Sequence, residues 1–112
     1  MNKILLSVII PAYNEKNTIL EIIKRVKKVK LEKEIIIIDD FSTDGTKELL
    51  KKIKDPIINV FFHDKNYGKG HAIRTGIKKS KGEIIIIQDA DLEYDPKDYY
   101  KLIKPIVEGK TK

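Results

Sequence analysis

The sequence contains no cysteine, no tryptophan and one methionine, and its arginines are limited to Arg25 and Arg74. The absence of cysteine excludes disulfide bonds and thiolate metal sites. No apolar run approaches the roughly 20 residues that a membrane-spanning helix needs. The apolar segment near the N-terminus is stopped by Pro11 and has no small-residue cleavage site, so we interpret it as a strand and not as a signal peptide.

Lysine carries almost all of the positive charge, and the net charge is +6. A basic protein can bind nucleic acid or an anionic surface. Here the lysines are dispersed over predicted helix faces without interleaved aromatic residues, so we expect a solvated surface and no nucleic-acid partner. The enrichment in Lys, Ile and Glu fits a thermophile, and an AT-rich genome would produce the same bias.

Four short apolar runs predict four strands, at residues 5–10, 34–38, 57–62 and 84–88. They are rich in β-branched residues, as are strands that are buried on both faces of a parallel sheet. Between the runs, apolar residues recur at helical spacing, and Asp95-Pro96 predicts the start of a last helix that ends near Lys104. The pattern predicts an α/β fold with a mostly parallel sheet in the order 3-2-1-4 and helices on both faces.

Acidic residues follow two of these predicted strands directly. Asp39 and Asp40 come after the second, and Asp89 and Asp91 come after the fourth. In an extended backbone, residues two apart share one face at roughly 6.6 Å between Cα atoms, so the carboxylates of Asp89 and Asp91 can converge on one cation. Parallel sheets bind ligands outside the carboxyl ends of their strands, and oxygen ligands favour Mg²⁺ or Mn²⁺.

The other two predicted strands also end in polar residues. Pro11 to Glu15 follows the first, and His63 follows the third. The turn Gly68-Lys69-Gly70 opens a predicted helix, where it either offers N–H groups and the Lys69 charge to an anion or simply joins a strand to a helix. His63 has no metal-ligand partner at a usable spacing, and we assign it no role.

Four motifs occur in order: Pro11 to Glu15, Asp39 to Thr46, Asn66 to Gly70 and Asp89 to Leu92. Together they resemble the nucleotide-binding part of the inverting family 2 glycosyltransferases with the Rossmann-like GT-A fold. The branch that is most similar includes dolichol-phosphate mannosyltransferase and its polyprenyl-phosphate relatives. The resemblance covers residues 4 to about 109, and it implies that residues 1–112 form one nucleotide-diphospho-sugar-binding domain.

The resemblance also implies roles for individual residues. The donor would be a GDP- or UDP-sugar. Its base and ribose would contact Pro11, Tyr13 and Glu15, together with the carboxylates of Asp39 and Asp40. The remaining nucleotide-sugar contacts would come from Lys69 and from the turn Asp89, Ala90 and Asp91.

The resemblance further implies a divalent metal, Mg²⁺ or Mn²⁺, bound by Asp89 and Asp91 with Glu93 as a third ligand. Asp91 would be the catalytic residue, because the metal that it binds offsets charge on the leaving diphosphate. The acceptor would be a polyprenyl phosphate or another glycan acceptor. Its attack requires either a base or an acceptor that is already ionised, such as a lipid phosphate. We therefore expect a cytoplasmic protein, located at the cytoplasmic face of the membrane if its acceptor is a lipid.

Two functions stay open, because the chain ends where relatives continue into further strands. It is either a metal-dependent glycosyltransferase completed by a partner or a homodimer, or a binding module that holds a nucleotide sugar and transfers nothing. The partly unprotected edge of the strand at 84–88 predicts dimerisation or aggregation through that edge. A phosphotransfer protein would need an acidic residue at its first or third strand end, but the first strand here ends in Pro11-Ala12-Tyr13. A dinucleotide dehydrogenase would need a glycine fingerprint that is missing.

Overall fold

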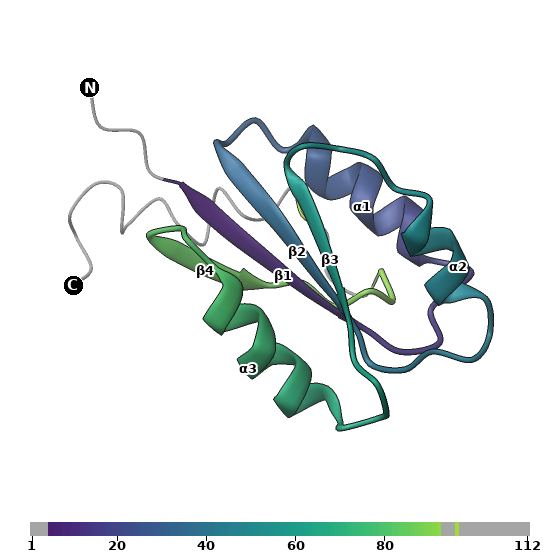
Figure 1. Ribbon diagram of the computed structural model, residues 1–112. Coiled ribbons are helices and arrows are strands. Elements are labelled where there is room, and N and C mark those ends of the chain that lie inside the picture. Colours follow the sequence, from purple (N-terminus) through teal and green to yellow (C-terminus); the bar gives the residue numbers. More distant parts are fainter. Residues whose placement is uncertain (1–4, 93–95, 97–112) are drawn as a thin grey trace.

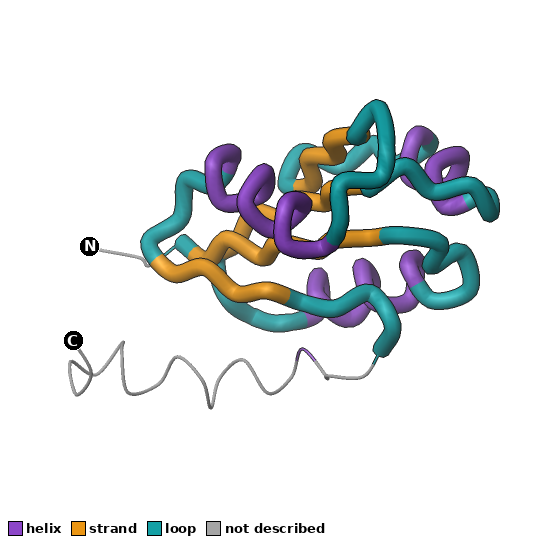
Figure 2. The backbone as a smooth tube through the Cα atoms, turned by 90° about the horizontal axis from the view of Figure 1, so that it is seen from below, coloured by secondary structure: helices purple, strands orange, loops and turns teal. Residues whose placement is uncertain are grey.

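The computed structural model describes residues 5–92 and residue 96, which form a sheet covered by helices on both faces (Figures 1 and 2). Its strands are β1 (Leu6–Ala12), β2 (Lys33–Asp39), β3 (Ile58–Phe62) and β4 (Ile84–Ile87). The helices between them are α1 (Ile19–Lys28), α2 (Thr46–Lys51) and α3 (Lys69–Lys79). Strands and helices therefore alternate as the sequence pattern predicts.

The sheet has the strand order β3-β2-β1-β4, and all neighbouring strands are parallel. This confirms the predicted topology. Because the strands are parallel, their carboxyl ends meet at one side of the sheet, which we call the carboxyl edge. Residues that follow β1, β2, β3 and β4 are thereby brought together, although they are far apart in the sequence.

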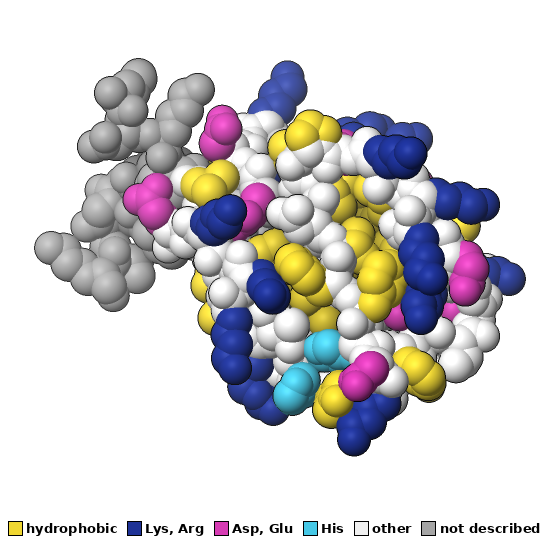
Figure 3. Space-filling model, viewed as in Figure 1, with side chains coloured by type: hydrophobic (Ala, Val, Ile, Leu, Met, Phe, Trp, Pro, Cys, Tyr) yellow, Lys and Arg dark blue, Asp and Glu magenta, His cyan; other side chains and the backbone are white. Residues whose placement is uncertain are grey.

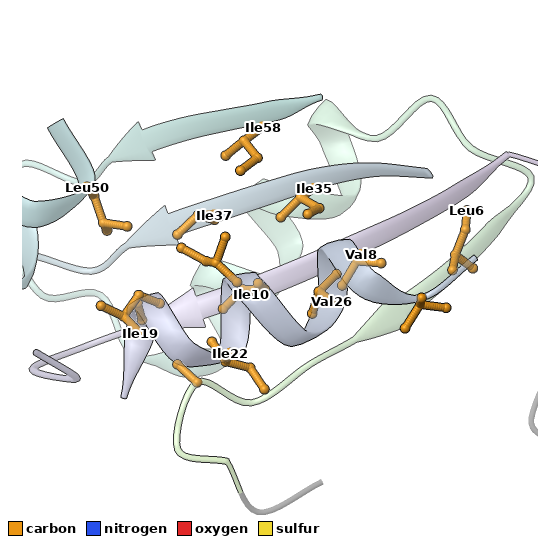
Figure 4. Close-up of a cluster of buried hydrophobic side chains, with 14 residues drawn as sticks. Leu6, Val8, Ile10, Ile19, Ile22, Val26, Ile35, Ile37, Leu50 and Ile58 are labelled. Carbon is orange, nitrogen blue, oxygen red and sulfur yellow. The ribbon is translucent and has the colours of Figure 1, made fainter. Parts of the chain in front are cut away.

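The main core lies between the sheet and helices α1 and α2 (Figure 4). Apolar residues recur along α1 every three or four positions, and they meet alternate residues of the strands, which point to the same face. The fully buried members of this core include Val8, Ile10, Ile19, Ile22, Val26, Ile35, Ile37 and Leu50. Helical and strand periodicity thus agree on one apolar interface.

Helix α3 covers the opposite face over β1 and β2. The buried residues there are Ile9, Ile36, Ile38 and Ala72, and Phe61 packs against them. Among the described residues, β4 lies at an edge of the sheet, and its residues Ile85 and Ile87 are 40% and 39% exposed. The second face is therefore less completely covered at β4 than at the centre of the sheet.

The first strand is longer than the sequence indicates, because β1 continues through Pro11 to Ala12. The prediction that Pro11 ends the strand is wrong. The fixed φ of proline is compatible with extended backbone, and the cost of proline in a strand is a missing N–H donor. Pairing with β4 extends only to Ile9, so Pro11 lies beyond the last residue pair on that side.

Most of the predicted helix from Asp95 to Lys104 lies outside the described residues. Within residues 5–92 and residue 96, no helix has the length and apolar character that would let it cross a membrane.

Candidate functional site

A cavity of about 290 Å³ opens at the carboxyl edge of the sheet. Its size is near the lower end of the roughly 300–1,000 Å³ that is usual for ligand clefts. It is lined by Pro11, Ala12, Tyr13, Glu15, Asp40, Asn66, Gly68, Lys69, Ala72, Asp89, Ala90 and Asp91. All of the predicted nucleotide-binding residues except Asp39 line this one cavity, and they come from the end of β1, from the loops after β1, β2 and β4, and from the start of α3.

The loops after β1 and β2 are held together by hydrogen bonds between backbone and side chains. The N–H of Asn14 donates to Ser42 Oγ at 2.9 Å, and the N–H of Thr43 donates to Asn14 Oδ1 at 2.8 Å. Asn14 adopts a left-handed φ of 54°, a conformation that asparagine tolerates better than most residues. The N–H of Glu15 donates to Thr46 Oγ1 at 2.9 Å. These bonds fix the rim of the cavity beside Tyr13 and Glu15.

Asp39 and Asp40 have different environments, although they are adjacent. Asp39 is fully buried, and its Oδ2 accepts the N–H of Ser42 at 3.1 Å. It follows Ile35 and Ile37 at alternate strand positions, and both isoleucines belong to the core under α1. Asp39 thus makes a hydrogen bond within the turn after β2 and does not line the cavity, whereas Asp40 does.

The carboxylate of Asp40 is nearly buried and accepts three hydrogen bonds. His63 Nδ1 lies 2.8 Å from Oδ1, the N–H of Tyr67 donates to Oδ1 at 2.9 Å, and the N–H of Gly68 donates to Oδ2 at 2.8 Å. Burial raises the pKa of Asp40, but the hydrogen bonds from His63, Tyr67 and Gly68 outweigh it and hold the pKa below its usual value. Asp40 is therefore ionised at neutral pH.

Gly68 directly precedes α3 as its N-cap residue and has a φ of 97°, a positive value that favours glycine. This geometry turns its N–H toward Asp40. The sequence leaves open whether the glycine turn binds an anion. In the structure the N–H of Gly68 already donates to an anion of the protein itself.

The turn Asp89-Ala90-Asp91 is tied to the start of α1. Thr18 precedes that helix, and its hydroxyl donates to the carbonyl oxygen of Ala90 at 2.5 Å. On the strand side, the N–H of Gln88 donates to the carbonyl of Ile9 at 2.8 Å. The turn is thus fixed from both sides. Thr18 was not predicted as a site residue, because its contact joins residues that are 72 positions apart in the sequence.

Asp89 forms an ion pair with Lys69, whose side chain is largely exposed. The ammonium group shows that this carboxylate already attracts a cation. The described residues hold no group of three or more His, Cys, Asp or Glu side chains that could bind a metal by themselves. Mg²⁺ and Mn²⁺ sites that share substrate phosphates need only one or two carboxylates, so Asp89 and Asp91 fit such a metal. Glu93, the predicted third ligand, lies outside the described residues.

His63, which has no role predicted from the sequence, is a largely buried neighbour of Asp40. It follows β3, which is adjacent to β2 in the sheet, so the two strand ends bring His63 and Asp40 together. A signal for this contact was present, since both residues follow strands directly. The strand order 3-2-1-4 makes these two strands neighbours.

The fold and the cavity define an α/β protein with an acid-rich ligand cleft at the carboxyl edge of a parallel sheet. The chain belongs to glycosyl transferase family 2, whose model matches residues 7–112. This confirms the resemblance inferred from the four motifs.

A similar curated protein is the undecaprenyl-phosphate 4-deoxy-4-formamido-L-arabinose transferase of Pseudomonas fluorescens, which is 32% identical over 92% of this chain and 32% of its own length. The chain spans about a third of the length of most of the curated relatives that it matches.

Solved structures of glycosyltransferases share the fold. The mannosyltransferase PcManGT from Pyrobaculum calidifontis, in complex with GDP-Man and Mn²⁺, has a TM-score of 0.77 and 28% identity over 88% of this chain and 30% of its own. S. aureus TarS 1-349, in complex with UDP, has a TM-score of 0.79 and 27% identity over 92% of this chain and 32% of its own.

Proposed function

We propose that this chain binds a nucleoside-diphosphate sugar together with Mg²⁺ or Mn²⁺ and forms the donor site of an inverting glycosyltransferase. The observation that carries this proposal is the cavity shared by Asp40, Lys69, Asp89 and Asp91 in a member of glycosyl transferase family 2. Related structures contain GDP-Man with Mn²⁺ or UDP. A GDP- or UDP-sugar is therefore the first donor to test.

Each side chain suits one part of such a donor. Asp40 can accept a hydrogen bond from an N–H of the base or from a ribose hydroxyl, and the half-exposed ring of Tyr13 offers a surface on which the base can stack. Lys69 can contact the diphosphate. Asp89 and Asp91 would hold the divalent cation, which, when bound, offsets the charge that develops on the leaving diphosphate.

The reaction that fits this arrangement is a direct displacement at the anomeric carbon. A bond forms between an acceptor oxygen and that carbon, while the bond from the carbon to the diphosphate oxygen breaks. The bonding electron pair leaves with the nucleoside diphosphate, and attack from the opposite face inverts the configuration. A polyprenyl phosphate is the acceptor we propose, because it is ionised already and needs no base. A relative of this chain is named for undecaprenyl phosphate.

The experiment that tests this proposal measures binding and transfer separately. Calorimetry with GDP, UDP and their sugars in the presence of Mn²⁺ should detect binding. Transfer of radiolabelled sugar to a polyprenyl phosphate in vesicles should follow if the chain is active. Binding without transfer to any acceptor would indicate a binding module. Absence of binding to every nucleotide tested would refute the proposal.

We propose further that the free edge of β4 contacts a second copy of the chain. Within the described residues, β4 is an edge strand with two exposed isoleucines, and such edges favour pairing between chains. Sedimentation velocity should detect a dimer at high protein concentration, and Ile87→Lys should shift it toward monomer. A wild-type chain that stays monomeric at high concentration would contradict this prediction.

A further inference from the structure

A chain of polar contacts runs from the cavity to α3 through His63. Asp40 and His63 have side chains that are only 4% and 10% exposed. His63 Nδ1 lies 2.8 Å from Asp40 Oδ1, and Nε2 lies 3.0 Å from Thr75 Oγ1. Both ring nitrogens are thus engaged. On the face seen in Figure 3, the two histidines of the chain lie together, and their ring centroids are 5.3 Å apart.

Three hydrogen bonds orient the carboxylate of Asp40. An ionised carboxylate can accept about four hydrogen bonds, two on each oxygen. Oδ1 accepts two, from His63 and from the N–H of Tyr67, while Oδ2 accepts one, from the N–H of Gly68. One acceptor position remains on Oδ2. Asp40 lines the cavity, so a ligand donor there has this position to bond to.

The hydrogen-bond directions also fix the proton on His63. An ionised carboxylate can only accept hydrogen bonds, so Nδ1 must carry a proton and donate a hydrogen bond to Asp40. The hydroxyl of Thr75 donates to the carbonyl of His71 at 3.1 Å, so its oxygen can accept from a protonated Nε2. Alternatively, the hydroxyl turns and donates to an unprotonated Nε2. In both arrangements Nδ1 is the donor to Asp40, and the Thr75 hydroxyl forms the hydrogen bond with Nε2.

We propose that His63 is a positioning residue of the nucleotide site, which acts through Asp40 by holding its carboxylate so that Oδ2 faces the ligand. This inference rests on the proposed function. His63 does not line the cavity, whereas Asp40 does. Without the Nδ1 donor, the carboxylate would lose one of its three hydrogen bonds and could rotate away from the ligand.

The groups around His63 are few among the described residues. Asp40 comes from the end of β2, while Tyr67 and His71 contact the His63 ring edge-on from the loop before α3 and from α3 itself. The hydroxyl of Tyr67 donates to Asp64 at 2.8 Å and so is turned away from Asp40. His63 is therefore the side chain that supplies a donor to Asp40.

Two substitutions separate the two nitrogens of the ring. In His63→Asn the amide nitrogen can take the place of Nδ1 and still donate to Asp40, whereas in His63→Gln the amide reaches the position of Nε2. Both variants lose the ring contacts with Tyr67 and His71. We expect GDP or UDP to bind His63→Gln about tenfold more weakly than wild type, and His63→Asn within about threefold of wild type. His71→Gln, a control in the same cluster, should leave affinity unchanged.

A double-mutant cycle tests whether His63 acts through Asp40. Once Asp40→Asn has removed the carboxylate, adding His63→Gln should cost little further affinity. Additive losses would instead indicate a general structural effect and would overturn the inference. Nitrogen-15 NMR of the wild-type chain gives a readout that needs no variant to fold. The Nδ1–H signal of His63 should shift when nucleotide binds, and the signals of His71 should not.

The outcomes distinguish this inference from the proposed function. Normal binding by wild type together with an unaffected His63→Gln overturns the positioning role alone. An unshifted Nδ1 signal in the presence of bound nucleotide also overturns it. Absence of nucleotide binding by wild type overturns the proposed function, and the positioning role falls with it.

Discussion

Removal of divalent cations should weaken the binding of GDP or UDP by about a hundredfold, roughly 3 kcal/mol. The cavity presents the carboxylates of Asp89 and Asp91 to a ligand that is itself negatively charged. Two like charges about 4 Å apart repel by about 4 kcal/mol at the effective dielectric constant of a protein surface. The ammonium group of Lys69 pairs with Asp89 and offsets only part of this repulsion.

Asp91→Asn should abolish most of this metal dependence while the fold stays intact, since Asp91 is exposed at the rim. Calorimetry with Mn²⁺ and with EDTA measures the difference for wild type and variant. Glu48→Gln is the matched control, because it removes one negative charge from α2 without touching the cavity. If neither EDTA nor Asp91→Asn changes nucleotide affinity, then Asp89 and Asp91 do not form a metal site.

The fold could be predicted from the sequence because its signals are periodic and local. Runs of β-branched residues such as 34–38 are too short for helices, and the apolar residues from Ile19 to Val26 recur at helical spacing. Short connections between them then favour a parallel sheet. The prediction that Pro11 ends the first strand is wrong because proline weakens a strand by lacking an N–H donor. That loss matters only where a partner strand needs the donor.

The candidate site could be predicted in part, because parallel strands collect their carboxyl ends at one edge. That rule brings Asp40, Lys69 and Asp89 to one cavity, as the structure has them. Strand alternation could also have separated Asp39 from Asp40, since neighbouring residues in a strand point to opposite faces. The contact between His63 and Asp40 could have been predicted in the same way, because both residues directly follow neighbouring strands. The contact between Thr18 and Ala90 depends on loop conformations and rotamers, for which the sequence carries no local signal.

Gly82→Ala should destabilise the protein by about 2–3 kcal/mol. Gly82 lies between α3 and β4, and its N–H donates to Ser7 Oγ at 2.8 Å. A Cβ atom at this position would lie 2.7 Å from the carbonyl oxygen of Leu5 and 2.8 Å from the backbone nitrogen of Ser7. Those backbone atoms belong to the segment that pairs β1 with β4, because the N–H of Glu83 donates to Leu5 at 2.9 Å.

The strand pair can accommodate the methyl group only by separating, and the cost should appear as a fall of about 10–20 °C in the thermal midpoint. Thermal and urea unfolding of Gly82→Ala against wild type measure it. Gly70→Ala is the matched control, because its Cβ would have only the Arg74 guanidinium as a neighbour, at 3.7 Å. Alanine is also the better helix former, so this control should be neutral or up to about 1 kcal/mol more stable. A Gly82→Ala protein as stable as wild type would mean that β4 is not held against β1 as closely as this geometry requires.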